Sequence, residues 1–266
     1  MTAREDFGLS EVIRQLARRG MGGVEWYKDS CLLRRIEVRM RARDVGTLIR
    51  YAALLADDAS EAERLLHTLS VRVTGFFRNP ETWLRLWSIL GEEAAPGGAG
   101  RRAWTMGCAT GEEAWSLAML LRDLGQPATP PVITASDVDA IAIAAAERGS
   151  YLPQAAEAIR EVLPSAQGEV RDGHFEVDPL LRPLITFVRE DLTQSRPPLA
   201  AHDLVLCRNL LIFLGPEGQR RVLDAAVRGL RPGGLLVLGR TESLVALPTP
   251  PLEAVDVVHR IYRRTA

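Results

Sequence analysis

The segment Trp104-Thr-Met-Gly-Cys-Ala-Thr-Gly-Glu-Glu113 decides the fold, because it joins a short apolar run to an amphipathic stretch. The run from Arg102 to Gly107 has the length and composition of a buried strand, and the stretch from Glu112 to Leu124 has helical spacing. Between them, Gly107 and Gly111 permit a tight turn and close approach of the backbone to a ligand. The segment therefore predicts the first strand, turn and helix of an α/β sheet that binds its ligand at the carboxyl ends of its strands.

The turn does not match the dinucleotide fingerprint G-x-G-x-x-G, and it lacks the lysine of a P-loop. Glu112 and Glu113 stand at the helix N-terminus, where they would repel a pyrophosphate and favour a ligand that carries positive charge. S-adenosylmethionine (SAM), with its sulfonium and ammonium groups, is such a ligand. On this segment alone, an ordinary glycine turn followed by a helix-starting pair of acids remains an equal alternative.

Two further acidic clusters follow predicted strands. In Ala135-Ser-Asp-Val-Asp139, Asp137 can accept both hydroxyls of a ribose, and Asp139 is placed to cap the next helix. In Arg189-Glu-Asp-Leu192, Asp191 can accept from the amino group of an adenine. Both acids of the first cluster could instead serve only as caps, yet polar groups at three successive strand ends favour a nucleoside-type cofactor.

Short apolar runs and amphipathic stretches alternate further along the chain, which predicts a doubly wound, Rossmann-like α/β sheet. The predicted strands are Val132 to Ser136, Asp203 to Cys207 and Leu235 to Gly239, and the predicted helices are Ala140 to Arg148 and Glu217 to Leu230. The alternation breaks between Gly168 and Arg189, where Gly173 to Val177 and Leu184 to Val188 are typical of short strands in an inserted β subdomain. A final antiparallel edge strand is expected over Ala254 to Arg264.

The N-terminal part has a different pattern, because apolar residues recur there at helical spacing from Leu9 to Leu69. The run GEEAAPGGAG at 91–100 is small and flexible, with no hydrophobic period. We therefore expect an all-helical domain over 1–90, a linker over 91–100 and the α/β domain over 101–266, with the inserted β subdomain near 168–189.

Composition excludes several classes of protein. The 33 Lys and Arg residues nearly cancel the 34 Asp and Glu residues, which argues against nucleic acid as the main partner. No apolar run reaches the length of a spanning helix and the first residues do not resemble a signal peptide, so we expect no membrane insertion and a cytoplasmic location. The three cysteines and four histidines have no ligand spacing, so no metal and no disulfide is predicted, and the histidines are expected at the surface or at edges.

A series of motifs resembles, in the same order, those of the chemotaxis receptor glutamate O-methyltransferases, the CheR family of SAM-dependent enzymes. The matching segments are Val73 to Pro80 (family T-x-F-F-R-D-P), Gly107 to Met119 (G-C-x-T-G-E-E-P-Y-S-L-A-M), Ala135 to Asp139, Ala146 to Tyr151, Phe187 to Leu192, Asp203 to Phe213, and Leu230 to Leu244 (L-x-P-G-G-x-L-x-x-G-x-x-E-S-L). The resemblance implies an N-terminal domain that recognises receptors, a SAM-binding α/β domain, and methyl-ester formation on glutamate side chains of chemoreceptors, with S-adenosylhomocysteine (SAH) as product.

Site residues carry over from these motifs. The resemblance implies that Thr74 and Arg78 line the cofactor and active site, that Glu113 and Asp137 hold the amino acid and ribose ends of SAM, that Asp191 and Leu192 flank the adenine, and that Arg208 and Asn209 lie near the methionine part, with Gly107 in the turn. Arg78 is the candidate catalytic residue, which would place the substrate carboxylate. From the residues alone, an ion pair between Arg78 and Glu81 would be the ordinary expectation.

Two departures bear on activity, because Arg72 stands where the family usually has Asn and Phe213 where it usually has Tyr. Phe213 keeps the ring and loses a hydroxyl. A glutamate carboxylate is ionised at neutral pH, so the reaction needs placement rather than a general base. The alternatives are a SAM- or SAH-binding regulatory or scaffold protein with weak or no transferase activity, and a methyltransferase for another carboxylate or a small molecule.

A basic helix is predicted around Arg34 to Arg43, where Arg35, Arg39 and Arg43 share one face. Because receptor methylation helices are expected to be rich in Glu, this face is predicted to attract the cytoplasmic helical region of chemoreceptors. A solvated helix face without a partner is the alternative. The protein itself is expected to be a monomer.

Overall fold

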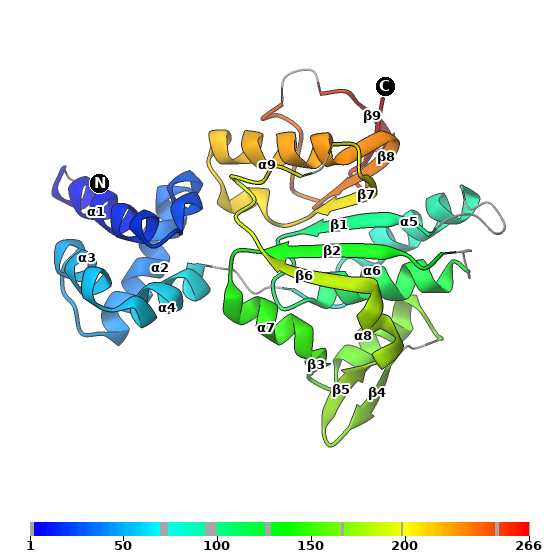
Figure 1. Cartoon of the computed structure of the whole chain (residues 1–266), viewed down its shortest axis with the longest axis horizontal. Coiled ribbons are helices and arrows are strands. Elements are labelled where there is room, and N and C mark those ends of the chain that lie inside the picture. Colours follow the sequence, from blue (N-terminus) through cyan, green and yellow to red (C-terminus); the bar gives the residue numbers. More distant parts are fainter. Residues whose placement is uncertain are drawn as a thin grey trace.

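The computed structural model describes residues 3–69, 74–93, 100–125, 129–165, 168–197, 199–247 and 250–265 of the 266-residue chain. Figure 1 shows two lobes, a small one built from the N-terminal helices and a larger one built around a twisted sheet. Among the described residues, no helix combines the length and apolar character needed to cross a membrane.

The large sheet is mostly parallel. Within the described residues its seven strands lie in the order β6 (Ile185–Arg189), β2 (Val132–Asp137), β1 (Arg102–Met106), β7 (His202–Cys207), β8 (Leu230–Leu238), β10 (Ile261–Arg264) and β9 (Leu252–Asp256). The first five are mutually parallel, while β10 runs antiparallel to both β8 and β9. The expected doubly wound α/β fold is confirmed.

Helices cover both faces of this sheet because the side chains of its strands alternate. In β1, Trp104 and Met106 pack in one cluster with helix α9 (Pro216–Gly229). Ala103 points to the opposite face and joins the largest core cluster. Helices α5 (Pro80–Glu92), α6 (Glu112–Asp123) and α7 (Ala140–Arg148) lie on that side.

The small sheet differs from the prediction. It consists of β3 (Ser150–Tyr151), β5 (His174–Val177) and β4 (Gly168–Arg171), and it is accompanied by α8 (Ala155–Val162) and the 3₁₀ helix η2 (Pro179–Leu184). The assignment of 184–188 to this sheet was wrong, because β6 pairs in parallel with β2 along its whole length. As an edge strand, β6 leaves three of its five residues exposed and none fully buried, so its short apolar sequence does not show which of the two sheets it joins.

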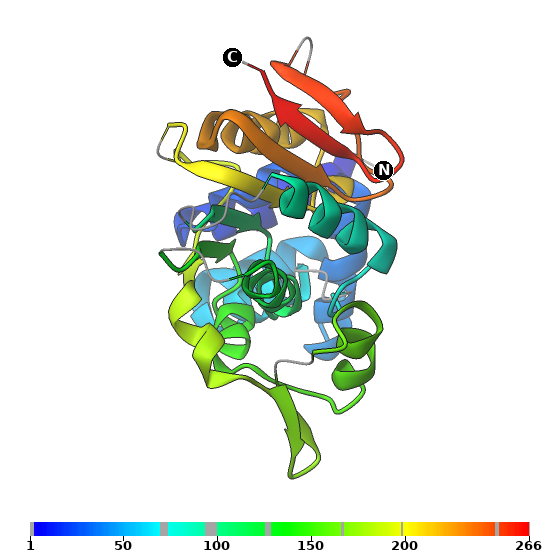
Figure 2. The same cartoon turned by 90° about the vertical axis from the view of Figure 1, so that its right-hand side faces the viewer.

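The expected last strand is two strands, because the chain turns between β9 and β10 at 257–260, where Arg260 has a φ of 55°. Figure 2 shows these two strands at one end of the molecule and the β4–β5 hairpin at the other.

The small lobe consists of α1 (Ala3–Arg18), the 3₁₀ helix η1 (Gly22–Trp26), α2 (Asp29–Ala42), α3 (Leu48–Asp57) and α4 (Ala59–Leu69). Its core is separate, with Val12, Leu16, Leu32, Leu55 and Leu65 fully buried. Helix α5, which the sequence grouped with these helices, packs Trp83, Leu86 and Leu90 into the core of the large lobe. The change from one core to the other thus falls between α4 and α5, whereas most of the expected linker, 94–99, lies outside the described residues.

Candidate functional site

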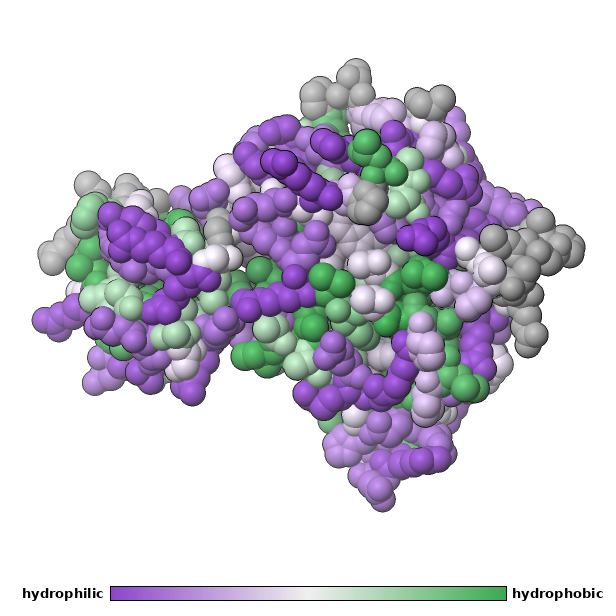
Figure 3. Space-filling view, viewed as in Figure 1, coloured by the Kyte–Doolittle hydropathy of each residue, from purple (hydrophilic) through white to green (hydrophobic). Residues whose placement is uncertain are grey.

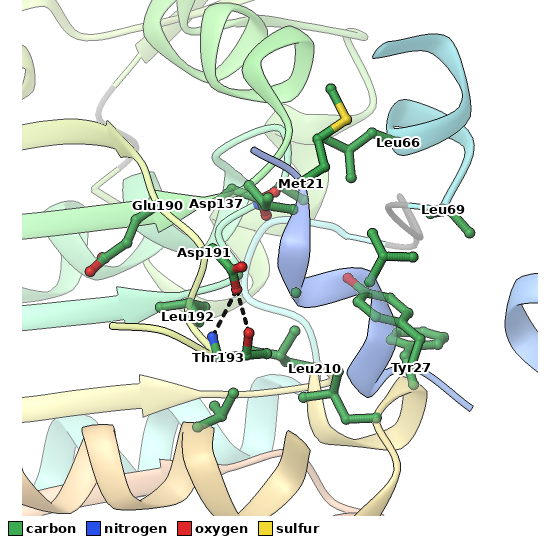
Figure 4. A pocket seen from close by; sticks show the side chains of 18 of the residues that line it. Met21, Tyr27, Leu66, Leu69, Asp137, Glu190, Asp191, Leu192, Thr193 and Leu210 are labelled. Carbon is green, nitrogen blue, oxygen red and sulfur yellow. Dashed lines mark hydrogen bonds between the residues drawn. The ribbon is translucent and has the colours of Figure 1, made fainter. Parts of the chain in front are cut away.

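A cavity lies at the carboxyl ends of the parallel strands, between the two lobes. One wall comes from the large lobe and carries Asp137, Asp191 and Leu192, and the opposite wall comes from the small lobe (Figure 4). The apolar lining includes Met21, Val24, Leu66, Leu69, Leu210 and Leu214. Of the residues predicted to bind cofactor, the structure brings Gly107, Asp137, Asp191, Leu192 and Asn209 to this cavity.

The turn between β1 and α6 is held against the end of β2. The amides of Gly107 and Cys108 donate to the carbonyl of Ser136 at 2.8 and 3.0 Å. Gly111 has a φ of 94°, and a Cβ there would come within 2.7 Å of the Ala146 side chain, so only glycine fits. The local geometry therefore explains both the tight turn and the position of its amides at the cavity.

Asp137 is buried, and each of its oxygens accepts one backbone hydrogen bond, from Asp139 and from Ala109, both at 2.9 Å. Burial raises the pKa of Asp137, and these two amides partly oppose the rise. A carboxylate offers about four acceptor sites, so two remain for a ligand with a pair of hydroxyls. Asp139 caps α7 by accepting from the amides of Ile141 and Ala142, which confirms its predicted capping role.

Asp191 lies on the same wall of the cavity as Asp137 and is fixed by its own loop. One oxygen accepts from the amide and hydroxyl of Thr193 at 3.0 and 2.6 Å, and the other accepts from Gln194 at 2.8 Å. A Cβ at Gly23 of η1 would collide with this carboxylate. The small lobe therefore reaches Asp191 only because glycine stands at that position.

Arg208 organises a second network beside the turn. It is buried, donates to Glu113 at 3.1 Å and to the carbonyl of Arg78 at 2.7 Å, and lies over the ring of Trp83. The hydroxyl of Thr105 donates to the other oxygen of Glu113 at 2.8 Å. Arg208 thus ties the 74–79 loop to the end of β7, and its buried Nε has no hydrogen-bond partner among the described residues.

The 74–79 loop also bonds to the start of α6. The hydroxyls of Thr74 and Thr110 bond to Glu112, whose pKa is raised by burial and lowered in part by these bonds. Arg78 is partly buried, and the Glu81 carboxylate pairs with Arg240. Thr74, Arg78, Glu113 and Arg208 therefore form a connected group next to the cavity without lining it.

Glu242 is a functional candidate that the sequence did not single out. It is 3% exposed and accepts from the amides of Asn209, Leu211 and Gly239 at 2.8, 2.7 and 2.7 Å. Burial raises its pKa, and the amides oppose the rise. Since Asn209 has a φ of 58°, this carboxylate holds a strained turn at the cavity wall. The signal was an acid four residues after the end of the apolar strand β8, within the G-R-T-E-S-L motif.

The start of α2 joins the two lobes on the side of Phe213, which lines the cavity. The amide of Lys28 donates to the carbonyl of Phe213 at 2.9 Å, and its ammonium donates to the carbonyl of Ile212 at 2.7 Å. The amide of Gly215 donates to the carbonyl of Trp26 at 2.7 Å. These bonds involve the short 3₁₀ helix η3 (Leu211–Phe213) and the residues after it. Arg72, the other departure, lies outside the described residues.

The basic helix is less available than predicted. Arg39 makes two hydrogen bonds to the buried Glu61 at 2.9 and 2.6 Å, and Arg43 lies 3.6 Å from the same carboxylate. Burial alone would raise the pKa of Glu61, but the bonds from Arg39 and Tyr51 lower it below its ordinary value. The face shared by these arginines thus points partly into the small lobe, whereas Arg34 and Arg41 are exposed.

No cluster of three or more His, Cys, Asp or Glu residues in the described part of the chain could hold a metal ion. All three cysteines are free thiols, and burial raises the pKa of Cys108 and Cys207. His202 was expected at the surface or at an edge but is buried, where its ring stacks on Trp104 and its Nδ1 bonds to the carbonyl of Gly229 at 3.1 Å.

Comparison with known proteins gives a consistent result. The family model described as "CheR methyltransferase, SAM binding domain" matches residues 72–255. A Rhodobacter capsulatus protein named "Uncharacterized 104.1 kDa protein in hypE 3'region" is 36% identical over 265 residues, covering 96% of this chain and 27% of that protein. The chain therefore spans about a quarter of that relative. A chemotaxis protein methyltransferase of Listeria monocytogenes is 27% identical, covering 82% of this chain and 83% of its own length. Chemotaxis protein methyltransferase 2 of Pseudomonas aeruginosa is 28% identical, covering 91% of this chain and 88% of its own length.

Proposed function

Because the chain belongs to the CheR methyltransferase family, whose SAM-binding domain matches residues 72–255, we propose that it transfers the methyl group of SAM to glutamate carboxylates of chemoreceptors. The observation that carries the proposal is the buried Asp137, whose oxygens keep acceptor capacity at the cavity. The proposed site is cytoplasmic, where the helical regions of receptors would meet it.

The residues present fit SAM. Asp137 can accept from ribose hydroxyls, and Asp191 with the apolar Leu192 can flank an adenine. The buried Nε of Arg208, without a partner among the described residues, is a donor of the kind that the carboxylate of a methionine group would satisfy. Glu113, which accepts a hydrogen bond from Arg208, adds a negatively charged carboxylate that suits the ammonium group of SAM.

Bound SAM supplies a methyl group on a positively charged sulfur. The protein then has to place an ionised carboxylate in line behind that methyl group and exclude water, and no general base is required. Arg78 is the residue proposed to place the substrate carboxylate by a charge-assisted hydrogen bond. Its loop is fixed on two sides, by Arg208 at its carbonyl and by the bond from Thr74 to Glu112.

The proposed receptor surface is the exposed part of α2. Figure 3 shows hydrophilic residues over much of the face of the small lobe that is turned to the viewer, with hydrophobic residues between them. Since Arg39 is occupied by Glu61, the exposed Arg34 and Arg41 are the residues proposed to attract an acidic receptor helix. Reversal of both charges should raise the KM for receptor several-fold at low salt and much less at high salt.

The test is transfer of labelled methyl from SAM to a receptor fragment, followed by release of the label with base, which is specific for a methyl ester. Arg78→Ala should reduce the rate by tenfold or more, whereas Arg228→Ala, which removes an exposed arginine that does not line the cavity, should leave it unchanged. Label that resists base would refute carboxylate transfer.

A second candidate is supported by Phe213, which presents a ring without a hydroxyl to the cavity. In that case the chain would bind SAM and SAH as a regulatory protein with weak or no transferase activity. Tight binding of SAH by calorimetry, together with no transfer to any receptor fragment, would favour this candidate.

A further inference from the structure

Tyr27 belongs to the small lobe but lines the same cavity as Asp137, Asp191 and Leu192. It directly follows η1, and its ring packs against both the core of the small lobe and the α9 side of the large lobe. Figure 4 shows its oxygen directed back into the cavity, on the side of Asp191. A residue of the small lobe therefore presents a polar group to the proposed nucleoside end of the site.

The hydroxyl of Tyr27 makes no hydrogen bond within the described ranges of the chain. Burial raises its pKa, and the negative charges of Asp137 and Asp191 raise it further. The phenol is therefore neutral at physiological pH and keeps its proton for donation. Because Tyr27 is only partly buried and its oxygen faces the cavity, an acceptor atom on a bound ligand can take this hydrogen bond.

The backbone on both sides of Tyr27 is fixed to the large lobe. Tyr27 forms an antiparallel bridge with Leu214, and the carbonyl of Trp26 accepts from Gly215 at 2.7 Å. The guanidinium of Arg221 lies 4.3 Å from the centre of the Trp26 ring. The hydroxyl is thus held in place before a ligand arrives, which reduces the entropy lost on binding.

We propose that Tyr27 is a further cofactor-binding residue, whose hydroxyl donates a hydrogen bond to an acceptor atom on the nucleoside part of bound SAM and SAH. The neighbouring carboxylates of Asp137 and Asp191 can only accept when ionised, so they leave the ring nitrogens and ether oxygen of a nucleoside without a donor. Tyr27 supplies that donor. This inference rests on the SAM site of the proposed function, but not on transfer to a receptor.

The test is calorimetric titration of the full chain with SAH and with 5′-methylthioadenosine, which keeps the nucleoside and lacks the amino acid part. Tyr27→Phe should raise the Kd for both ligands by about five- to tenfold, as expected for one neutral hydrogen bond. The matched control is Tyr262→Phe, because Tyr262 packs in the same core cluster without lining the cavity, and its Kd values should not change.

Equal Kd values for Tyr27→Phe and the unchanged protein would overturn the inference. A rise seen with SAH alone would also overturn it, since the contact would then lie on the amino acid part. Equal melting temperatures of the two proteins without ligand would exclude a folding effect. If methyl transfer fails while the five- to tenfold difference is present, the proposed reaction is wrong and the role of Tyr27 stands.

Discussion

Replacing Glu242 by Gln tests how a buried carboxylate supports the cavity wall. One of its oxygens accepts from both Asn209 and Gly239, and the other accepts from Leu211. The amide of Gln can keep the first two bonds, but its NH₂ group then faces the amide of Leu211. Loss of one charge-assisted bond, with a buried donor left unsatisfied, should cost about 2 to 4 kcal/mol of the free energy of unfolding.

Urea unfolding followed by circular dichroism measures this cost, and calorimetry with SAH measures the effect on the site. The Kd for SAH should rise, because the segment that carries Asn209 to the cavity loses its bond at Leu211. Glu161→Gln, at an exposed position on α8, is the control and should change stability by less than about 0.5 kcal/mol. If Glu242→Gln is as stable as the control and binds SAH normally, the carboxylate does not support the wall.

Three further predictions follow from the cavity and the small lobe. Phe213→Tyr should raise the methyl-transfer rate about tenfold, and equal rates would show that the hydroxyl has no role. SAH affinity should fall as pH decreases through the raised pKa of Asp137, at a higher pH than an ordinary Asp would require, and calorimetry on Asp137→Asn should show weak binding without this dependence. Glu61→Gln should cost about 3 to 5 kcal/mol at pH 7, because it leaves Arg39 unpaired. Since the pKa of Glu61 is lowered in the folded state, its carboxylate stabilises the fold at neutral pH, and this contribution is lost as the pH falls below about 4.5. Urea unfolding should therefore show a smaller difference in stability between Glu61→Gln and the unchanged protein at acid pH than at pH 7.

The sheet and its first turn could be predicted because they depend on local pattern. The run from Arg102 to Gly107 and the acids after β2 and β6 are adjacent in sequence to the strands that position them, and parallel strands bring their ends together. The placement of β6 was harder to predict, because this edge strand has no fully buried residue and resembles a strand of a small meander.

Contacts between distant segments could not be predicted. Arg39 turns inward because Glu61 lies on another helix, and helical spacing alone does not show which face of α2 meets α4. Tyr27 reaches the cavity through a bridge to Leu214, 187 positions away in sequence. Helix α5 has ordinary amphipathic spacing, so its pattern does not show which of two cores receives it.

Lys28 is the only lysine in the sequence, and its ammonium sits where the two lobes meet, on the carbonyl of Ile212. Reagents that acylate amines therefore have one side-chain target, besides the terminal amine, and that target lies at the contact between the two lobes. A fluorophore placed there would report separation of the lobes without any engineered cysteine. The rate of its attachment would itself measure how often the hydrogen bond to Ile212 opens, and whether SAH slows that opening.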